Sequence, residues 1–343
     1  MLNYTAFIGT NSTRNSEGIY TLKIPKKTLY PNIKCTQSNY NAGALALSND
    51  NNYLYAVEEG MTYKGYASGG VNAYKINKDG SLSLLNGMPT NGQRPCSINV
   101  DKENKHLYVA NFFGGSISIF SLNSDGSINQ LVRTITELKP KEWLHAIHDV
   151  NLINNGKFLA YMSVASSSFI VINPLTGKKL TQYNYGNKVF VRSFTSFDKY
   201  IYTMLQKTGE IFVLEYLEES NKIRKIQKVT ALEVFDKNMD FGTSAIKITP
   251  NGKLLLAGIR NTNSISIFSI GKEGQLKFEN SIELPGECPR DFNISADGKI
   301  VITALQQSDE VCIHTINYEN KSLDYTNNKI HIPSPAAIEI IEG

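Results

Sequence analysis

Three stretches of this chain repeat one pattern, in which four apolar strands are separated by short polar turns. The clearest copies read PCSINVDKENKHLYVANFFGGSISIFSLNSDGSI from Pro95, SAIKITPNGKLLLAGIRNTNSISIFSIGKEGQL from Ser244 and PRDFNISADGKIVITALQQSDEVCIHTINYENKSL from Pro289. Self-similarity at a period of roughly 45–50 residues, with four strands per copy, is typical of a β-propeller. The repeat therefore predicts an all-β ring in which each blade is a four-stranded antiparallel sheet.

The rest of the chain divides into blades of the same kind. Alternating apolar residues and turn signals predict complete blades at residues 43–85, 95–134, 146–183, 189–229, 243–282 and 290–325. The N-terminal segment supplies three further strands, and residues 336–341 supply a lone strand. A propeller must close its ring, so we expect residues 336–341 to pair with residues 5–8 and complete a seventh blade. No linker separates the repeats, so residues 1–343 are predicted to form one domain.

Charge and cysteine usage narrow the expected partners. The 35 Lys and Arg residues against 31 Asp and Glu give a net charge of +4, with no basic run that would favour nucleic-acid binding. The N-terminus lacks a signal-peptide pattern, and no apolar run approaches the roughly 18–20 residues that cross a bilayer. The four cysteines show no metal-ligand spacing. We therefore expect a cytoplasmic protein with no metal, cofactor, nucleic-acid or membrane partner.

The order of strands places different kinds of turn on the two faces of the ring. Turns such as 155–157 and 251–253 join first to second strands and have ordinary hairpin chemistry. The other face gathers the second-to-third loops and the crossings between blades. We call the end of the central channel at this face the mouth. Polar residues from several blades that converge on the mouth fit a small-molecule site. These residues are Glu59, Asn111, Arg260 and Gln306 from the loops, and Arg94, Trp143, His145, His148 and Arg290 from the crossings.

Several of these residues also have a purely structural interpretation. Asn111 and Gln306 could cap turns, and one of the arginines Arg260 and Arg290 could be paired with Glu59 or Asp291. His148 begins an inner strand, where the core could hold it. The loop at residues 61–68 could fold over the mouth or lie beside it, and the sequence leaves both arrangements open.

The chain resembles the seven-bladed lactonase family, which includes propeller-type 6-phosphogluconolactonases and carboxymuconate lactonising enzymes. The segments FIGTNSTRNSEGIYTLKI, RPCSINVD, HAIHDV, CPRDFNISADGK and IPSPAAIEI carry the resemblance, which spans nearly the whole chain. It implies a metal-independent hydrolase that opens an anionic sugar lactone. The positions that match the family's site are Glu59, Asn111, His148, Arg260, Arg290 and Gln306.

The chain departs from the family pattern at several positions near the expected mouth. Ser97 stands where many members have a histidine, and Phe190-Val191 stands where an Arg-His pair is usual. Gln206 replaces a glutamate, and Ala245 aligns near an acid. Ala146 replaces the first histidine of a His-Ala-His segment. The resemblance therefore implies a mouth that keeps its cations and loses several acids and histidines.

Lactone hydrolysis needs an activated water, a stabilised oxyanion and a hold on the substrate's anionic group. His148 is the expected general base because the pKa of imidazole lies near neutrality, and Glu59 would orient it or relay a proton. Arg260 and Arg290 would bind carboxylate or phosphate through their guanidinium forks, and Arg260 would also take part in catalysis. The remaining expected substrate contacts are Asn111, Gln206, Gln306 and His145.

Two other functions remain open from the sequence. A propeller with an arginine-rich mouth could bind an anionic ligand or partner without catalysis, since fold alone does not decide function. Two departures favour non-catalytic binding. Phe190-Val191 stands in place of the usual Arg-His pair of blade five, and Gln206 replaces a glutamate. A cycloisomerase that acts on a muconate-like dicarboxylate is the other enzymatic alternative.

Overall fold

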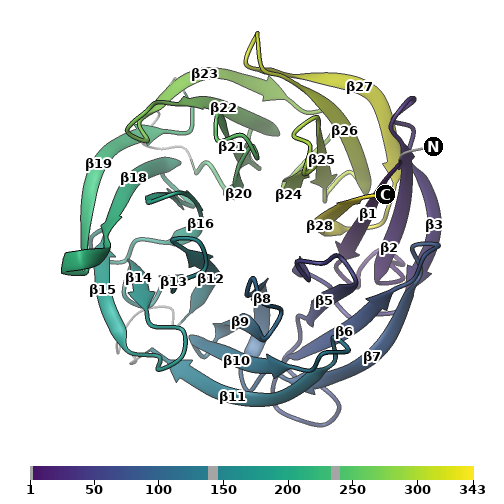
Figure 1. The fold of residues 1–343 in the computed structure, drawn as a ribbon. Helices are drawn as coiled ribbons and strands as arrows, with labels where there is room; N and C mark the ends of the chain where they lie inside the picture. The colour runs from purple at the N-terminus through teal and green to yellow at the C-terminus, as the bar shows by residue number, and fades with distance from the viewer. Residues whose placement is uncertain (1–2, 138–145, 233–239) are drawn as a thin grey trace.

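In the part of the chain that the structure describes, 28 strands form seven four-stranded antiparallel sheets, arranged as the blades of a ring (Figure 1). This computed structural model describes residues 3–137, 146–232 and 240–343. The seven-bladed all-β architecture predicted from the repeat is confirmed. Within the described residues, no helix is long and apolar enough to cross a membrane.

Each blade runs outward from an inner strand that lines the channel. Blade one contains β28 (Pro335–Glu342), β1 (Asn3–Thr10), β2 (Ile19–Pro25) and β3 (Asn32–Gln37). Blade two contains β4 (Leu45–Leu47), β5 (Tyr53–Glu58), β6 (Gly70–Ile76) and β7 (Leu82–Pro89), and blade three contains β8 (Gln93–Val100), β9 (His106–Phe113), β10 (Ser116–Leu122) and β11 (Ile128–Thr136).

The second half of the ring follows the same order. Blade four contains β12 (Ile147–Ile153), β13 (Phe158–Ser163), β14 (Ser168–Ile172) and β15 (Lys179–Asn184). Blade five contains β16 (Val191–Phe197), β17 (Tyr200–Leu205), β18 (Glu210–Leu217) and β19 (Lys222–Thr230), with a 3₁₀ turn at Glu218–Ser220. Blade six contains β20 (Thr243–Ile248), β21 (Leu254–Ile259), β22 (Ser264–Ile270) and β23 (Leu276–Glu283), and blade seven contains β24 (Pro289–Ile294), β25 (Ile300–Leu305), β26 (Glu310–Asn317) and β27 (Ser322–His331).

The two ends of the chain close the ring in blade one, as the sequence predicts. β28 pairs antiparallel with β1, with Thr5 opposite Ile341 and Ile8 opposite Ile338. Asn3 and Gly343 exchange two backbone hydrogen bonds, of 2.9 and 3.0 Å. The termini therefore lie side by side at one blade (Figure 1).

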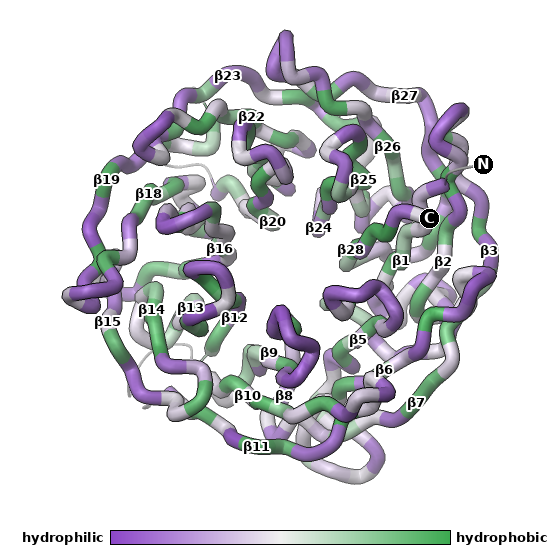
Figure 2. Tube along the Cα trace, in the orientation of Figure 1, coloured by the Kyte–Doolittle hydropathy of each residue, from purple (hydrophilic) through white to green (hydrophobic). Residues whose placement is uncertain are grey.

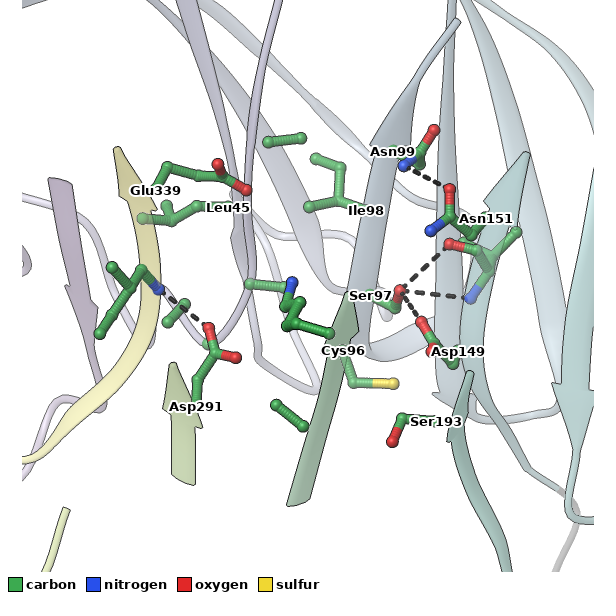
Figure 3. A pocket seen from close by; sticks show the side chains of 18 of the residues that line it. Leu45, Cys96, Ser97, Ile98, Asn99, Asp149, Asn151, Ser193, Asp291 and Glu339 are labelled. Atoms are coloured by element: carbon green, nitrogen blue, oxygen red, sulfur yellow. Dashed lines mark hydrogen bonds between the residues drawn. The ribbon is translucent and has the colours of Figure 1, made fainter. Parts of the chain in front are cut away.

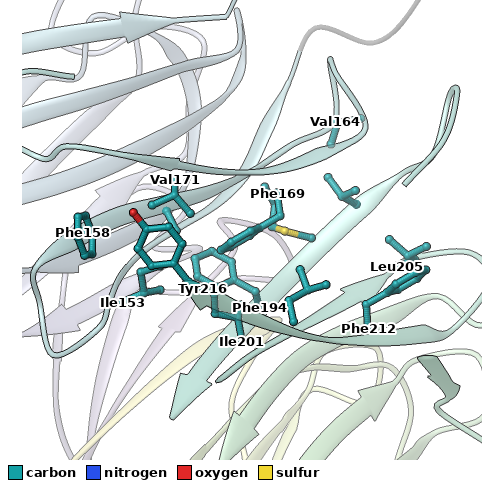
Figure 4. Packing of buried hydrophobic residues seen from close by; sticks show 14 of the residues in the cluster. Ile153, Phe158, Val164, Phe169, Val171, Phe194, Ile201, Leu205, Phe212 and Tyr216 are labelled. Atoms are coloured by element: carbon teal, nitrogen blue, oxygen red, sulfur yellow. The ribbon is translucent and has the colours of Figure 1, made fainter. Parts of the chain in front are cut away.

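The apolar core lies between neighbouring blades rather than at the centre of the ring. Between blades four and five, Phe158, Phe169, Phe194 and Tyr216 interdigitate (Figure 4). The rings of Phe169 and Phe194 meet edge to face at a centroid distance of 5.1 Å. Burying one such side chain stabilises the fold by ~1.5–3 kcal/mol. Outer strands such as β19 and β27 are largely hydrophilic (Figure 2).

The turns between first and second strands lie at the end of the channel opposite the mouth, as expected. Gly252 and Gly298 adopt φ angles of +69° and +68°, which favour glycine because it has no Cβ. The Asn251 side chain accepts a hydrogen bond from Thr249 Oγ1, at 2.8 Å. These turns are therefore scaffold.

The loop at residues 61–68 is anchored to blade two. Tyr63 is buried, and its hydroxyl donates to Asn72 Oδ1 at 2.9 Å. A Cβ on Gly70 would lie 2.0 Å from the Tyr63 ring, and one on Gly87 would lie 2.2 Å from its hydroxyl. Because two glycines make room for this ring, the loop is fixed against β6 and β7.

Candidate functional site

In the described residues, six inner strands carry a β-bulge at the end that faces the mouth. In β28 and β20 the extra residues are small, Ala336 and one of Ser244 and Ala245, and in the other four strands they have larger side chains. The register shifts between Pro95 and Ser97 in β8, and at the equivalent places in β12, β16 and β24. A bulge leaves one residue outside the ladder and redirects its side chain. The extra residues of β8, β12, β16 and β24 line one cavity of about 390 Å³, which occupies the channel. They are Cys96, His148, Arg192 and Arg290.

The residue that follows each second strand also lies at this end of the ring. In several blades its backbone N–H donates to the carbonyl of the residue before the inner strand. Gln206 donates to Phe190 at 3.0 Å, and Gln306 donates to Cys288 at 2.9 Å. The mouth is therefore built from the bulges, the ends of the second strands and the crossings. The equivalent donors in blades four and six are Val164 and Arg260, and in blade two Glu59 donates to the carbonyl of Asn41, a few residues before β4.

Three arginines meet at the mouth, and none of them has an acidic partner among the described residues. Arg192 is 6% exposed, and its Nη1 donates to Gln206 Oε1 at 2.9 Å. Its buried Nε has no hydrogen-bond partner within the described part of the chain. Burial lowers the pKa of Arg192, and the positive charges of Arg290 and Arg260 lower it further. No carboxylate lies within 4.0 Å of any of these guanidiniums among the described residues, so the mouth favours an anion.

His148 lies next to these charges in a partly aromatic environment. Its ring meets Phe112 edge to face at 5.7 Å and Phe190 at 6.2 Å, measured between centroids. Burial lowers the pKa of His148, and the positive charges of Arg192, Arg290 and Arg260 lower it further. The low pKa keeps the imidazole neutral at pH 7, and a neutral imidazole has one ring nitrogen that can accept a proton.

Below the mouth, one carboxylate accepts hydrogen bonds from two neighbouring strands and so connects three inner strands. Ser97 Oγ of β8 donates to Asp149 Oδ1 at 2.7 Å, and the backbone N–H of Phe194 in β16 donates to Asp149 Oδ2 at 3.0 Å. Figure 3 shows the Ser97 bonds and the neighbouring contact between Asn99 and Asn151. Burial raises the pKa of Asp149 to about 6, so it is mostly ionised at pH 7.

A second set of charged groups, Asp291, Glu339 and Lys247, lines the same cavity. Asp291 of β24 accepts a 3.0 Å hydrogen bond from the backbone N–H of Ile338, across the closing blade. Burial raises the pKa of Glu339 to about 7. Burial alone would lower the pKa of Lys247, but the charges of Asp291, Glu339 and Asp149 raise it. This part of the channel is internally charge-compensated, in contrast to the mouth.

The structure brings most of the expected site residues together. His148 and Arg290 line the channel cavity, while Arg260 and Gln206 line an adjoining cavity of about 190 Å³. The side-chain Nε2 of Gln306 is buried and has no partner in the described residues. His145 and Trp143 lie outside the described residues.

Two expected residues have other contacts. Glu59 Oε1 accepts hydrogen bonds from Arg94, at 2.8 Å from Nη2 and 3.2 Å from Nε, so its carboxylate is paired with Arg94 rather than with His148. Asn111 is fully buried inside blade three, where its Nδ2 donates to Ser116 Oγ at 3.1 Å and to Ser118 Oγ at 3.0 Å. The residue that follows it, Phe112, is the one beside His148.

Sequence reasoning did not identify Arg192. The family comparison drew attention to Phe190-Val191, but the mouth arginine of blade five is the next residue. Alignment of the inner strands by their bulges would have found it, because Val191-Arg192-Ser193 occupies the same place as Pro289-Arg290-Asp291. The described residues also contain no group of three or more His, Cys, Asp or Glu that could hold a metal ion.

Comparison with known proteins identifies one protein family for nearly the whole chain. Residues 5–340 match the family described as "Lactonase, 7-bladed beta-propeller". The 6-phosphogluconolactonase of Bacillus subtilis is 25% identical over 361 aligned positions, which cover 99% of both chains. A putative 6-phosphogluconolactonase from Bacteroides uniformis has a TM-score of 0.87 at 24% identity, and covers 99% of both chains. The periplasmic gluconolactonase of Pseudomonas aeruginosa has a TM-score of 0.88 at 19% identity, again over 99% of both. At these identities the two solved structures establish a common fold.

Proposed function

The chain belongs to the lactonase family of seven-bladed β-propellers, and from this premise we propose that it hydrolyses a lactone with an anionic group, of the 6-phosphogluconolactone type. One observation carries the proposal. Three guanidiniums without carboxylate partners in the described structure, Arg192, Arg260 and Arg290, converge beside the neutral His148. The names of the relatives support the same class of substrate.

The proposed reaction assigns each group a step. Arg192 and Arg290 bind the anionic group of the substrate through their guanidinium forks. His148 accepts a proton from a water molecule as the water oxygen attacks the lactone carbonyl carbon, and Arg260 stabilises the oxyanion. The carbonyl then re-forms as the ring C–O bond breaks, and His148 returns the proton to the leaving oxygen. The product is the open-chain hydroxy acid.

The direct test is hydrolysis by the purified protein, measured against the spontaneous rate. We expect turnover of 6-phosphogluconolactone and a fall of roughly 10²–10⁴-fold in His148→Ala, because a positioned base contributes that much. His331→Ala removes an exposed histidine on β27 and should leave the rate unchanged. The proposal uses no metal, so EDTA should also have no effect. A rate equal to the spontaneous one, or an unaltered rate in His148→Ala, would refute the proposal.

A second candidate function is non-catalytic binding of an anion. It is favoured by the pairing of Glu59 with Arg94, which leaves His148 without a carboxylate partner among the described residues. Calorimetry with gluconate-type anions distinguishes the two functions. Binding that depends on Arg290, combined with no turnover of any lactone, would support the binding protein.

A further inference from the structure

We propose that the mouth selects an anion that also carries a ring, which lies against Phe112 and Phe190 while the anionic group binds the arginines. This inference rests on the function proposed above and specifies its substrate further. It follows from the division of the mouth into an aromatic side and a cationic side.

The aromatic side crosses three blades. Phe112 lies at the end of β9, the second strand of blade three, and Phe190 precedes the inner strand of blade five. Their ring centroids are 6.3 Å apart with planes inclined at 33°, and both rings contact His148 of blade four. They form a nearly continuous apolar surface around the proposed base.

These two rings are held in place from behind. Both are partly buried and pack against the apolar cluster between blades four and five, which includes Val164, Phe169 and Leu205. A contact surface fixed in this way loses little conformational freedom when a ligand binds. The exposed part of each ring is therefore a preformed apolar surface rather than a loose side chain.

The cationic side comes from the next three blades. Arg192, Arg260 and Arg290 belong to blades five, six and seven. At the equivalent positions, blades three and four contribute uncharged residues, namely Cys96, Phe112 and Val164, beside the neutral His148. A ligand that fills both sides needs an apolar or C–H-rich face at one end and a negative charge at the other.

A lactone and its product differ in how they fit this arrangement. A lactone ring presents a compact face to Phe112 and Phe190, with its carbonyl beside His148. The open-chain hydroxy acid has the same anionic group at its far end but lacks that face. The open form also gains a carboxylate that the arginines can bind, so the contribution of the ring has to be measured with ligands that carry a single anionic group.

The test uses two anions that are not lactones and differ mainly in the ring, phenyl phosphate and ethyl phosphate. Calorimetry should show that phenyl phosphate binds the wild-type protein roughly tenfold more tightly, since stacking on fixed aromatic rings contributes to affinity. Phe190→Leu should lower the affinity for phenyl phosphate severalfold and leave the affinity for ethyl phosphate unchanged. Arg192→Gln should weaken both ligands. Phe278→Leu, which changes a ring on the outer strand β23 of blade six, is the matched control.

Each outcome bears on the inference separately from lactonase activity. Equal affinities for the two phosphates, or an equal loss of both in Phe190→Leu, would overturn it even if lactones are hydrolysed. A preference for phenyl phosphate in the absence of any lactone turnover would retain it and reject the proposed reaction. If Phe190→Leu does not fold, Phe112→Leu replaces it, and the same two outcomes apply.

Discussion

At the scale of single residues, burial and the mouth arginines keep the imidazole of His148 in its neutral form. Burial is the largest cause of the low pKa of His148, and the charge of Arg192 is the next. Protonation of the imidazole would remove the lone pair that the proposed reaction needs. The rate should therefore be constant near neutral pH and fall on the acid side, with a midpoint below the usual histidine value of about 6.5.

The variant Arg192→Gln tests this coupling. Removal of one positive charge raises the pKa of His148, so the acid limb of the kcat/KM profile should move to higher pH. Burial remains, so the midpoint should stay below about 6.5. Arg133→Gln removes an exposed arginine on β11 and is the control. An acid limb that stays in place in Arg192→Gln would show that the arginine does not act on His148.

A second histidine links stability to pH far from the mouth. His314 in β26 is fully buried beside Tyr325, and burial lowers its pKa to about 4. The unfolded chain binds this proton below about pH 6.5, whereas the folded chain does so only below about pH 4. The contribution of His314 to stability is therefore present at neutral pH and is lost as the pH falls towards 4.

Urea unfolding of His314→Leu at two pH values measures that contribution. Between pH 7 and pH 4, the wild-type protein should lose up to about 3 kcal/mol more unfolding free energy than the variant, because each pKa unit corresponds to ~1.4 kcal/mol. The raised pKa values of Asp149 and Glu339 have the opposite effect, because they favour the folded state at low pH. Both proteins contain these two residues, so their effect cancels when the wild-type protein is compared with the variant. An identical loss in both proteins would contradict the assignment.

The sequence identified some mouth residues better than others, for a physical reason. Arg260 directly follows the strongly apolar strand β21, where an arginine is conspicuous, and Arg290 is the second residue of β24, at the start of a clear copy of the repeat. The contact of Glu59 with Arg94 joins two segments that are 35 residues apart, so it depends on how blades two and three meet. The buried position of Asn111 depends on which face of β9 turns inward at its last residues. Neither fact follows from local pattern.

At the scale of elements, the inner strands position the mouth through their bulges. Alternation of apolar residues predicts each strand, because one face of every blade must be buried. A bulge, however, is a mismatch between two strands, and one strand's sequence does not reveal it. This is why the pattern located β16 but did not show that Arg192 is its extra residue.

Substitution of Asp149 tests whether its hydrogen bonds below the bulges stabilise the fold and the mouth. Asp149→Ala leaves Ser97 and the N–H of Phe194 without their acceptor, and should lower the unfolding free energy by about 1–3 kcal/mol. It should also weaken phosphate binding, since the bulges of β12 and β16 would lose their common support. Asp149→Asn keeps an acceptor oxygen and should lose less of both. Equal losses in the two variants would show that the charge, rather than the hydrogen bonds, is what matters.

At the scale of the whole molecule, the repeat and the need to close the ring were enough to predict seven blades. Each blade has two apolar faces, and a ring with a gap would expose two of them to water. The partner of β28 could therefore be deduced before any contact was known. The mouth is a property of the closed ring, because its residues come from separate blades that meet only after closure.

The closing strand should therefore contribute heavily to stability. Ile338 of β28 is 2% exposed, lies opposite Ile8, and packs in the cluster between blades one and seven. Ile338→Ala should lower the unfolding free energy by about 2–5 kcal/mol, the usual cost of such a truncation in a well-packed core. Leu84→Ala, at a 52% exposed position on β7, should change it by no more than about 0.5 kcal/mol. In a urea titration of Ile338→Ala, circular dichroism and phosphate binding should be lost together and at lower urea than in the wild-type protein. If binding is lost well before the strands unfold, the mouth depends on local structure rather than on closure of the ring.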